Sequence, residues 1–436
     1  MLRMTELPAG SSPKEPLGRK YAALITASGI SNLGDGIGTV AWPWVASLLT
    51  RDPIAIALVG VSLRLPWLVF SLPAGVIIDR VDRRRLVLAM DLLRFLLLTG
   101  LGLAVWASQP LILNEGNGLP SQPIYWLLLA TALVYGCAEV LRDNSAQTLM
   151  PAIVPASRLA AANGRMWSVE LVGNSLLGPP LAGLIIAVAL PLAFVANGFG
   201  FVFAALCIYS IKGVFRAKPA AEKRHWLAEI RDGAAFLWRN TLLRDMALGV
   251  AVMNGMGHLM LVALVLYTQE VLQMSAMQYG LLLTAAAAGG IIGGFCAAPL
   301  VKWLGPGNAL RLTLIASTVQ FAVIALSTHA APVWCALVLA EFFGMVWNTI
   351  TVTMRQSLVP QHILGRVNSV NRFFGWGSIP IGLLLSGIIV RVTESVTSRE
   401  LALAAPFAFA ALVMAITCIC MWKRFANARL LSARFQ

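Results

Sequence analysis

The residues with the clearest capacity for chemistry are ionisable side chains that stand inside long apolar stretches. Asp35 lies in the segment SNLGDGIG, and Arg64 lies in the next apolar stretch. An ionised side chain at the centre of a bilayer costs about 2.5–3.5 kcal/mol even on the mildest scale, so each one should line a cavity or have a partner. As antiparallel helices, the two stretches would place both residues at a similar depth, roughly 20 Å from one face at 1.5 Å per residue. We therefore expect an ion pair between Asp35 and Arg64.

Asp35 is also the first candidate for proton binding. Burial disfavours the charged form of a carboxyl group and a nearby arginine favours it, so the balance can leave such a group titratable near neutral pH. A change in the distance to Arg64, or in the access of water, would then bind or release a proton. The competing interpretation is a buried pair that only fixes how two helices pack, and the sequence leaves both open.

A second set of charges with alternating signs follows along the chain. Asp91 and Arg94 are one helical turn apart, and Glu139, Arg142 and Asp143 stand in a later apolar stretch. Spacings of three and four residues put oppositely charged partners on one face of a helix. We expect this set to form a charge network near the cytoplasmic end, acting as a gate together with the basic turn that precedes it; a substrate site is the alternative. Glu139, the deepest acid of the set, is the alternative site of a proton relay.

Isolated polar side chains inside other apolar stretches are candidates for lining a central cavity. Their alternative role is structural, because a protonated carboxyl, an amide or an imidazole can simply hydrogen-bond to a neighbouring helix. The candidates are Asn32, Glu170, Asn254, His258, Glu341 and Asn348.

Apolar segments of bilayer length make up most of the chain. Of its 436 residues, 58% are hydrophobic and 12% are charged, and the mean hydropathy is +0.78. Because a transmembrane helix needs about 20 consecutive apolar residues, the sequence predicts an all-α membrane protein with twelve transmembrane helices. The spans are expected near residues 22–46, 54–78, 86–107, 124–146, 160–188, 191–212, 244–268, 277–301, 309–328, 332–354, 368–391 and 401–422.

The basic residues indicate which side of the membrane each loop faces. They gather in every second loop and in the segment after the last span, whereas the other loops are nearly neutral. An excess of lysine and arginine marks cytoplasmic loops, so both termini are expected in the cytoplasm. This distribution also accounts for the net charge of +14 without a nucleic-acid partner.

The chain divides into two similar halves. MPAIVPASRLAAAN, which ends at Asn163, aligns without gaps with RQSLVPQHILGRVN, which ends at Asn368, and GPPLAG at 178–183 has a divergent counterpart in IPIGLLLSG. Such a repeat predicts two pseudo-symmetric six-helix bundles. The expected parts are a cytoplasmic tail (1–21), a first bundle (22–212), a cytoplasmic linker with an amphipathic helix (213–243), a second bundle (244–422) and a basic tail (423–436).

The turn expected between the second and third spans carries a recognisable motif. Its sequence, GVIIDRVDRRR, resembles the signature G-x-x-x-D-R-x-G-R-R of the major facilitator superfamily of secondary transporters, with Asp82 in place of the second glycine. The resemblance implies that Asp79 contacts the start of the eleventh span and holds the outward-open state. The residues that match the signature are Gly75, Asp79, Arg80, Arg83 and Arg84.

Two further motifs narrow the resemblance. The pattern of Gly136, Glu139 and Asp143, together with MPAIVP, LAAAN and LGRVNSV, is similar to the branch that contains macrolide, multidrug and enterobactin exporters. Small residues and a proline in the fifth span resemble the motif associated with the antiporters of the superfamily. These residues are Gly173, Gly178, Pro179 and Gly183.

The resemblance implies a monomeric secondary transporter of the bacterial cytoplasmic membrane, which exports amphipathic small molecules in exchange for protons. A dedicated siderophore exporter and a narrow-substrate importer of the same fold are the alternatives, since nothing in the sequence sets the direction of transport. The sequence shows no nucleophile elbow, phosphate-binding glycine loop or metal-ligand spacing, so we expect neither an enzyme nor a cofactor or metal site. The expected partners are the substrate, protons and the lipid bilayer.

Overall fold

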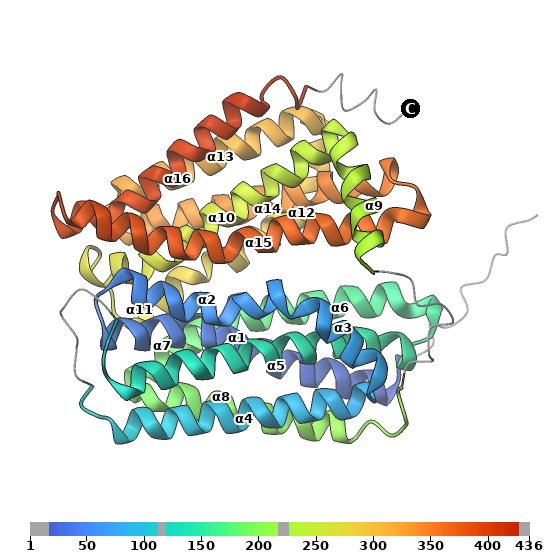
Figure 1. Ribbon diagram of the computed structural model, residues 1–436, viewed down its shortest axis with the longest axis horizontal. Helices are drawn as coiled ribbons and strands as arrows, with labels where there is room; N and C mark the ends of the chain where they lie inside the picture. Colours follow the sequence, from blue (N-terminus) through green and yellow to red (C-terminus); the bar gives the residue numbers. More distant parts are fainter. Residues whose placement is uncertain (1–16, 112–118, 217–225, 427–436) are drawn as a thin grey trace, which may run out of the picture.

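The computed structural model describes residues 17–111, 119–216 and 226–426, apart from a few side chains within helices, among them that of Asp79. The chain folds into helices that form two bundles lying side by side. The N-terminal bundle occupies the lower part of Figure 1 and the C-terminal bundle the upper part. The predicted all-α fold with two bundles is therefore confirmed.

The N-terminal bundle contains six helical segments, four of them unbroken. Its elements are α1 (Gly18–Leu49), α2 (Pro53–Val69), α3 (Ser71–Arg80), α4 (Arg83–Ala107), α5 (Pro123–Ile153), η1 (Ala156–Arg158), α6 (Leu159–Leu171), the π-helical turn η2 (Val172–Leu177), α7 (Gly178–Val188) and α8 (Leu190–Tyr209). Helices α2 and α3 follow each other as one segment, and so do α6, η2 and α7.

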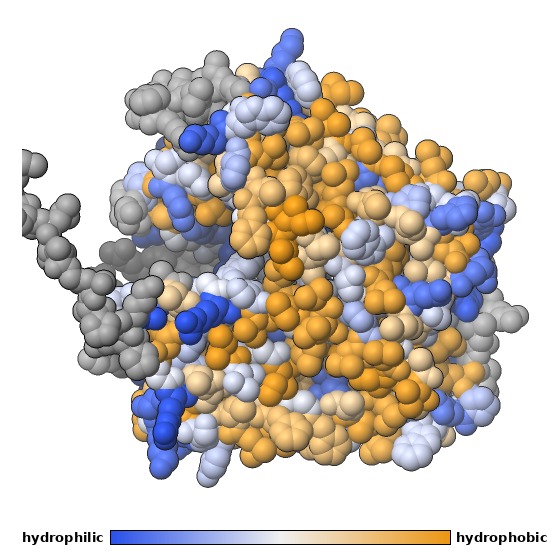
Figure 2. Space-filling model, turned by 180° about the vertical axis from the view of Figure 1, so that it is seen from behind, coloured by the Kyte–Doolittle hydropathy of each residue, from blue (hydrophilic) through white to orange (hydrophobic). Residues whose placement is uncertain are grey.

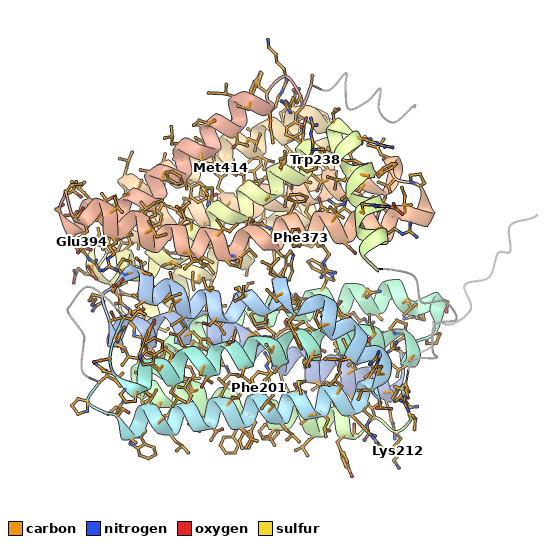
Figure 3. All side chains as sticks on the ribbon, in the orientation of Figure 1. Phe201, Lys212, Trp238, Phe373, Glu394 and Met414 are labelled. Atoms are coloured by element: carbon orange, nitrogen blue, oxygen red, sulfur yellow. The ribbon has the colours of Figure 1, made fainter. Side chains whose placement is uncertain are left out.

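The C-terminal bundle repeats this plan after the short helix α9 (Trp226–Arg239), which packs across the end of α15. Figure 3 shows Trp238 of α9 close to α15, where its ring stacks on that of Phe374 with centroids 5.8 Å apart. The elements of the bundle are α10 (Thr241–Glu270), α11 (Ala276–Leu283), α12 (Ala285–Leu304), α13 (Pro306–Leu326), α14 (Ala330–Leu358), α15 (Gln361–Glu394) and α16 (Arg399–Met421).

The lengths of the helices suit a bilayer. Within the described residues, ten segments are long and apolar enough to cross a membrane, when α6 to α7 and α11 to α12 are each taken as one. Helix α2 is a shorter apolar helix that continues into α3, and α1 packs against α8, α7 and η2 in the same bundle. Each of the twelve spans expected from hydropathy coincides with one helical segment.

Prolines explain two of the interruptions in these segments. Pro73 has no N–H to donate to the carbonyl of Val69, and the helix breaks at Phe70, between α2 and α3. In the fifth span, Pro179 and Pro180 follow the π-helical turn, in which the N–H of Gly178 bonds to the carbonyl of Gly173, five residues back. The π-turn widens the helix beside the centre of the molecule.

Glycines allow the segments to cross closely, in the same way in both halves. A Cβ on Gly178 would lie 2.5 Å from Cα of Gly36 in α1, and Gly382 meets the backbone of Gly255 in α10 in the corresponding position. Five residues further on, the second glycine of each repeat packs against the other bundle. Gly183 faces the backbone of α11 at Ala276 and Met277, and Gly387 faces that of α2 at Pro53 and Ile54.

Charged side chains join the two bundles at the end of the molecule where α1 turns into α2. Glu270 accepts hydrogen bonds from Arg399 at 2.9 and 3.2 Å and lies 3.7 Å from Arg51, and Asp52 lies 3.4 Å from Arg391. Arg399 also bonds Glu394, which Figure 3 labels at this end. We call these residues, with Gln269 and Ser47, which are hydrogen-bonded to each other, the closed end.

The opposite end of the molecule is the arginine-rich end, which carries the turn between α3 and α4 with Arg83, Arg84 and Arg85. Figure 2, which views the molecule from behind, shows a recess between the two bundles at this end, on the left of the picture. The bundles therefore meet at one end and part at the other.

The glycine crossing in the fifth span makes a testable prediction about stability. Gly178→Ala should lower the free energy of unfolding by about 1–3 kcal/mol, because the new methyl group meets backbone atoms that cannot rotate away. Gly257→Ala, in α10, adds a methyl group with no heavy atom within 4 Å, and should leave stability unchanged or raise it by about 1 kcal/mol. Thermal unfolding of the two purified variants measures the difference, and equal melting temperatures would contradict the crossing.

Candidate functional site

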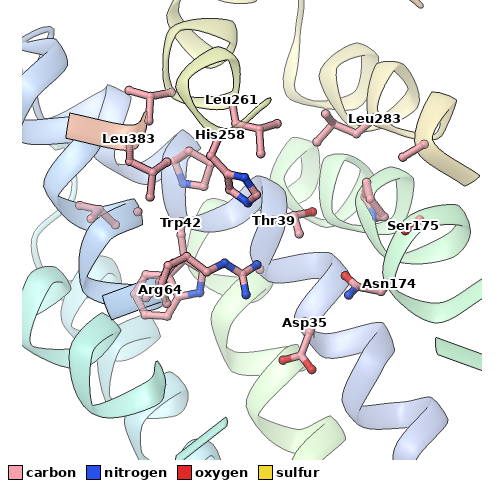
Figure 4. Close-up of a pocket in the computed structure, with 18 of the residues that line it drawn as sticks. Asp35, Thr39, Trp42, Arg64, Asn174, Ser175, His258, Leu261, Leu283 and Leu383 are labelled. Carbon is pink, nitrogen blue, oxygen red and sulfur yellow. The ribbon is translucent and has the colours of Figure 1, made fainter. Parts of the chain in front are cut away.

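A cavity of about 350 Å³ lies between the bundles, and side chains from both of them line it (Figure 4). Its polar lining is unevenly distributed, because α1, α2, α5 and η2 supply most of it. Its apolar walls come from both bundles. The polar lining residues are Asp35, Thr39, Arg64, Tyr135, Glu139, Asn174, Ser175, His258, Tyr279 and Glu341.

Arg94 of α4 holds Asp35 at the edge of this cavity. Its side chain is fully buried, and it donates hydrogen bonds to Asp35, to Ser31 Oγ at 3.0 Å and to Tyr135 Oη at 2.7 Å. The Tyr135 hydroxyl in turn donates to Asp35 Oδ1 at 2.8 Å. The guanidinium also lies over the ring of Phe201, 4.1 Å from its centroid, inside the N-terminal bundle (Figure 3).

The predicted ion pair between Asp35 and Arg64 is wrong. Both side chains face the cavity, as Figure 4 shows, but Asp35 pairs with Arg94, and Arg64 lies 3.6 Å from Glu139. The reason is burial: Arg94 has no contact with solvent and requires the nearest carboxylate, whereas the side chain of Arg64 is 39% exposed. Asp35 and Arg64 do lie at the same cavity, as expected from their depth. Depth alone does not show that Arg94, and not Arg64, is the partner of Asp35.

The remaining charges form a second buried cluster. Arg142 lies 3.3 Å from Asp91, 3.1 Å from Asp143, and donates to the carbonyl of Ala27 at 3.2 Å, so it connects three helices. Asp91 and Arg94 do not pair along α4 as expected, because Arg94 pairs with Asp35 and Asp91 pairs with Arg142. Helix spacing alone could not show that Asp91 and Arg94 each find a partner on another helix.

The basic turn is held by other contacts. Asp82, the residue that departs from the superfamily signature, caps α4 by accepting from the N–H of Arg85 at 3.0 Å and also accepts from the N–H of Phe215 at 2.6 Å. Arg84 donates to the carbonyls of Ile208 and Tyr209 at the end of α8, and Arg83 to that of Thr148. Among the described residues, no ion pair joins the turn to the buried charges, contrary to the expected gate.

The implied role of Asp79 stays a prediction. The backbone of Asp79 and that of Gly75 lie in α3, but the side chain of Asp79 and the surroundings of Gly75 lie outside the described part of the structure. The carbonyl of Arg80 accepts a hydrogen bond from Arg216 at 3.1 Å. This contact ties the turn to the segment that follows α8.

Of the isolated polar residues, His258 and Glu341 line the cavity. The other four do not, so their expected place in the cavity is wrong. Asn32 donates to the carbonyl of Ser28 within α1, and Asn254 donates to the carbonyl of Gly375 at 2.9 Å, which ties α10 to α15. Glu170 and Asn348 lie in α6 and α14, outside the lining.

Five polar residues of the cavity were not predicted from the sequence, namely Thr39, Tyr135, Asn174, Ser175 and Tyr279. Tyr135 precedes Glu139 by four residues, so helical spacing places both on one face of α5. Asn174 and Ser175 stand in the π-turn between the glycines of the fifth-span motif. The structural role of that motif is visible, since Gly173 and Gly178 pack on α1, Pro179 lines the cavity and Gly183 contacts α11.

Two bundles of six helices around a shared central cavity define a secondary transporter of the major facilitator fold. The nucleoside transporter NupG matches with a TM-score of 0.67 at 13% identity, covering 93% of this chain and 99% of NupG. A bacterial homologue of the human lysosomal transporter Spinster, solved in an inward-facing and unoccupied conformation, has a TM-score of 0.67 at 15% identity, with 97% and 98% of the two chains covered. Residues 11–433 match the transmembrane secretion effector family, MFS_3, and the chain belongs to this family of transporters, which are not enzymes.

Named relatives are bacterial exporters. The multidrug efflux pump Tap of Mycobacterium tuberculosis is 25% identical over 417 residues, which cover 90% of this chain and 91% of Tap. The enterobactin exporter EntS of Escherichia coli is 25% identical over 366 residues, or 80% of each chain. The resemblance stated from the motifs is therefore confirmed, and the protein is a multi-pass membrane transporter of small molecules.

The buried pair makes a prediction that separates Arg94 from Arg64. Arg94→Met should lower the free energy of unfolding by about 3–5 kcal/mol, because it leaves Asp35 without its buried counter-charge. Adding Asp35→Asn should restore part of the loss, and Arg64→Met should cost much less because that side chain reaches the cavity. Thermal unfolding of the three purified variants and the wild type checks this order, and equal effects of the two arginine substitutions would contradict it.

Proposed function

We propose that this protein exports amphipathic small molecules across the bacterial cytoplasmic membrane in exchange for protons. The observation that carries the proposal is the charge balance of the N-terminal bundle. Its ion pairs together contain one more carboxylate than guanidinium groups, so the whole set is neutral only when one acid holds a proton. Its members are the acids Asp35, Asp91, Glu139 and Asp143 and the bases Arg64, Arg94 and Arg142.

Asp35 is the coupling carboxylate in this proposal, and Glu139 is the relay. Both line the cavity, so water and a substrate can reach them, whereas Asp91 is fully buried. The 3.6 Å distance between Arg64 and Glu139 is longer than a hydrogen bond, which makes this the looser of the two pairs at the cavity. A substrate that displaces Arg64 would change the charge felt by both acids and so couple its own binding to the proton.

The direction of opening follows from the charge of the loops. An arginine-rich end is expected to face the cytoplasm. In that orientation the recess at this end opens to the cytoplasm, as in an inward-facing conformation. The same orientation would put both termini in the cytoplasm. The bundles at 22–212 and 244–422 would then rock about the glycine crossings, with 213–243 as their linker. One chain supplies both walls of the cavity, which is consistent with a functional monomer.

The second candidate is a dedicated siderophore exporter. The similarity to an enterobactin exporter favours it, and the exposed guanidinium of Arg64 offers a cation to an acidic or catechol compound. The two candidates share the fold and the proton site, and they differ in the compound that occupies the cavity.

Proton release from inverted membrane vesicles tests the proposed exchange. With an acid interior and a pH-sensitive dye, addition of a lipophilic amine, a macrolide or a catechol siderophore should release protons. Asp35→Asn should abolish the release at normal expression, because an amide cannot exchange a proton, and Glu139→Gln should weaken it. Glu400→Gln, on the exposed first turn of α16, is the control for loss of an acid and should behave as wild type. Full release by Asp35→Asn would exclude it as the coupling residue.

The closed end should control opening to the other side. Arg399→Gln removes the contacts with Glu270 and with the Arg51 carbonyl, so the outward-open state should be more populated. A cysteine replacing the fully buried Ser47, in a chain without its native cysteines, reports this as faster labelling by a membrane-impermeant thiol reagent. Arg311→Gln is the control, because the hydrogen bonds of Arg311 stay within the C-terminal bundle. Unchanged labelling in Arg399→Gln would show that these contacts do not hold the end closed.

A further inference from the structure

We propose that Glu341 of α14 selects the transported compound by binding a protonated amine, which makes amphipathic amine cations the substrate class. The inference rests on the proposed exporter function and assigns the second wall of the same cavity. It gives the C-terminal bundle a role in recognition that is separate from the proton site of the N-terminal bundle.

The charges of the two cavity walls are arranged differently. On the N-terminal wall, each carboxylate has an arginine, since Asp35 pairs with Arg94 and Glu139 with Arg64. On the C-terminal wall Glu341 is the only acidic or basic side chain besides His258, and no ion pair or hydrogen bond of its carboxylate occurs within the described residues. A compound that fills the cavity removes water from this unpaired carboxylate, so a cationic compound, which supplies the missing counter-charge, is favoured over a neutral one.

The position of Glu341 is set by the packing of its own helix. At Gly289 of α12 a Cβ would lie 2.8 Å from Cβ of Glu341, and it would also meet the carbonyl of Val338. The absence of a side chain at Gly289 therefore lets α12 press against α14 at this residue. The base of the Glu341 side chain is held by this crossing, and the residue is part of the cavity lining.

His258 supplies a second hydrogen-bond acceptor on the same wall. Its Nδ1 lies 3.0 Å from the carbonyl of Asn254, which can only accept, so the proton of a neutral imidazole sits on Nδ1. Nε2 is then an acceptor, and Figure 4 shows the ring directed into the cavity toward Arg64. A ligand with N–H groups, such as a protonated amine, can donate hydrogen bonds to both His258 Nε2 and the Glu341 carboxylate.

The rest of the cavity fixes the orientation of such a ligand. Arg64 extends from the opposite wall and repels a cation, which favours the amine on the C-terminal side. Leu261, Leu283 and Leu383, labelled in Figure 4, offer apolar contacts for the body of the compound. A volume of about 350 Å³ falls within the 300–1,000 Å³ typical of ligand pockets.

Equilibrium binding to the purified protein tests the proposal with a matched pair of fluorescent probes. Doxorubicin carries a protonated amine, and N-acetyldoxorubicin has the same skeleton with that charge removed. Because a hydrogen bond to a charged group stabilises by more than a neutral one, the wild type should bind doxorubicin about tenfold to a hundredfold more tightly than its acetylated form. Glu341→Gln should bring the two affinities together by weakening doxorubicin alone.

Two further variants control for indirect effects. Glu341→Asp keeps the charge on a shorter side chain and should retain part of the preference, whereas Glu400→Gln removes an acid far from the cavity and should retain all of it. Equal affinities of the wild type for the two probes, no binding of either, or a preference that survives Glu341→Gln would each overturn the proposal. The binding assay uses no proton gradient, so its result does not depend on whether the protein exchanges protons. Conversely, proton release from vesicles does not depend on a preference for amines, so the two proposals can fail separately.

Discussion

The ion pair between Arg94 and Asp35 is the interaction on which the rest of the N-terminal bundle depends. A guanidinium without contact with solvent is tolerated only when carboxylates and hydroxyls replace its water, and Asp35, Ser31 and Tyr135 do so from two other helices. This requirement fixes how α1, α4 and α5 sit together. It also holds the carboxyl of Asp35 at the edge of the cavity, where a substrate and water can reach it. The same contact therefore serves both packing and the proposed chemistry.

The two bundles share their packing but not their charges. Gly178 and Gly382 each cross the first helix of their own bundle, and Gly183 and Gly387 each contact the opposite bundle. When the gapless alignment of the halves is extended backwards, Trp347 takes the place of Arg142. Trp347 packs over Gly249 and against the ring of Phe425, 5.9 Å away, where the first bundle has buried ion pairs. The two halves thus share the crossings that hold them in place, whereas the position of the buried Arg142 in the first half is occupied by aromatic packing of Trp347 in the second.

The division of labour that we propose follows from this asymmetry. A proton site needs acids whose charge is balanced within the protein, because only then can a small change in surroundings bind or release a proton. A substrate site needs the reverse, a charge that the protein leaves unbalanced for the ligand. The N-terminal wall of the cavity has the first property and Glu341 has the second. Both walls meet the same compound, so its binding and the proton can influence each other across a single cavity.

The helical architecture can be predicted from the amino-acid sequence, whereas the pairing of the buried charges depends on how the helices pack. Apolar length and the repeat that ends at Asn163 and Asn368 determined twelve helices in two bundles, because a bilayer admits few other folds. The motif around Asp82 determined the superfamily, although only the structure shows that Asp82 caps α4. That Asp35 pairs with Arg94, and that His258 and Glu341 line the cavity while Asn254 does not, depends on how each helix is rotated about its axis. That rotation is set by contacts between helices far apart in the sequence, such as Gly178 on Gly36, and hydropathy and local spacing do not contain it.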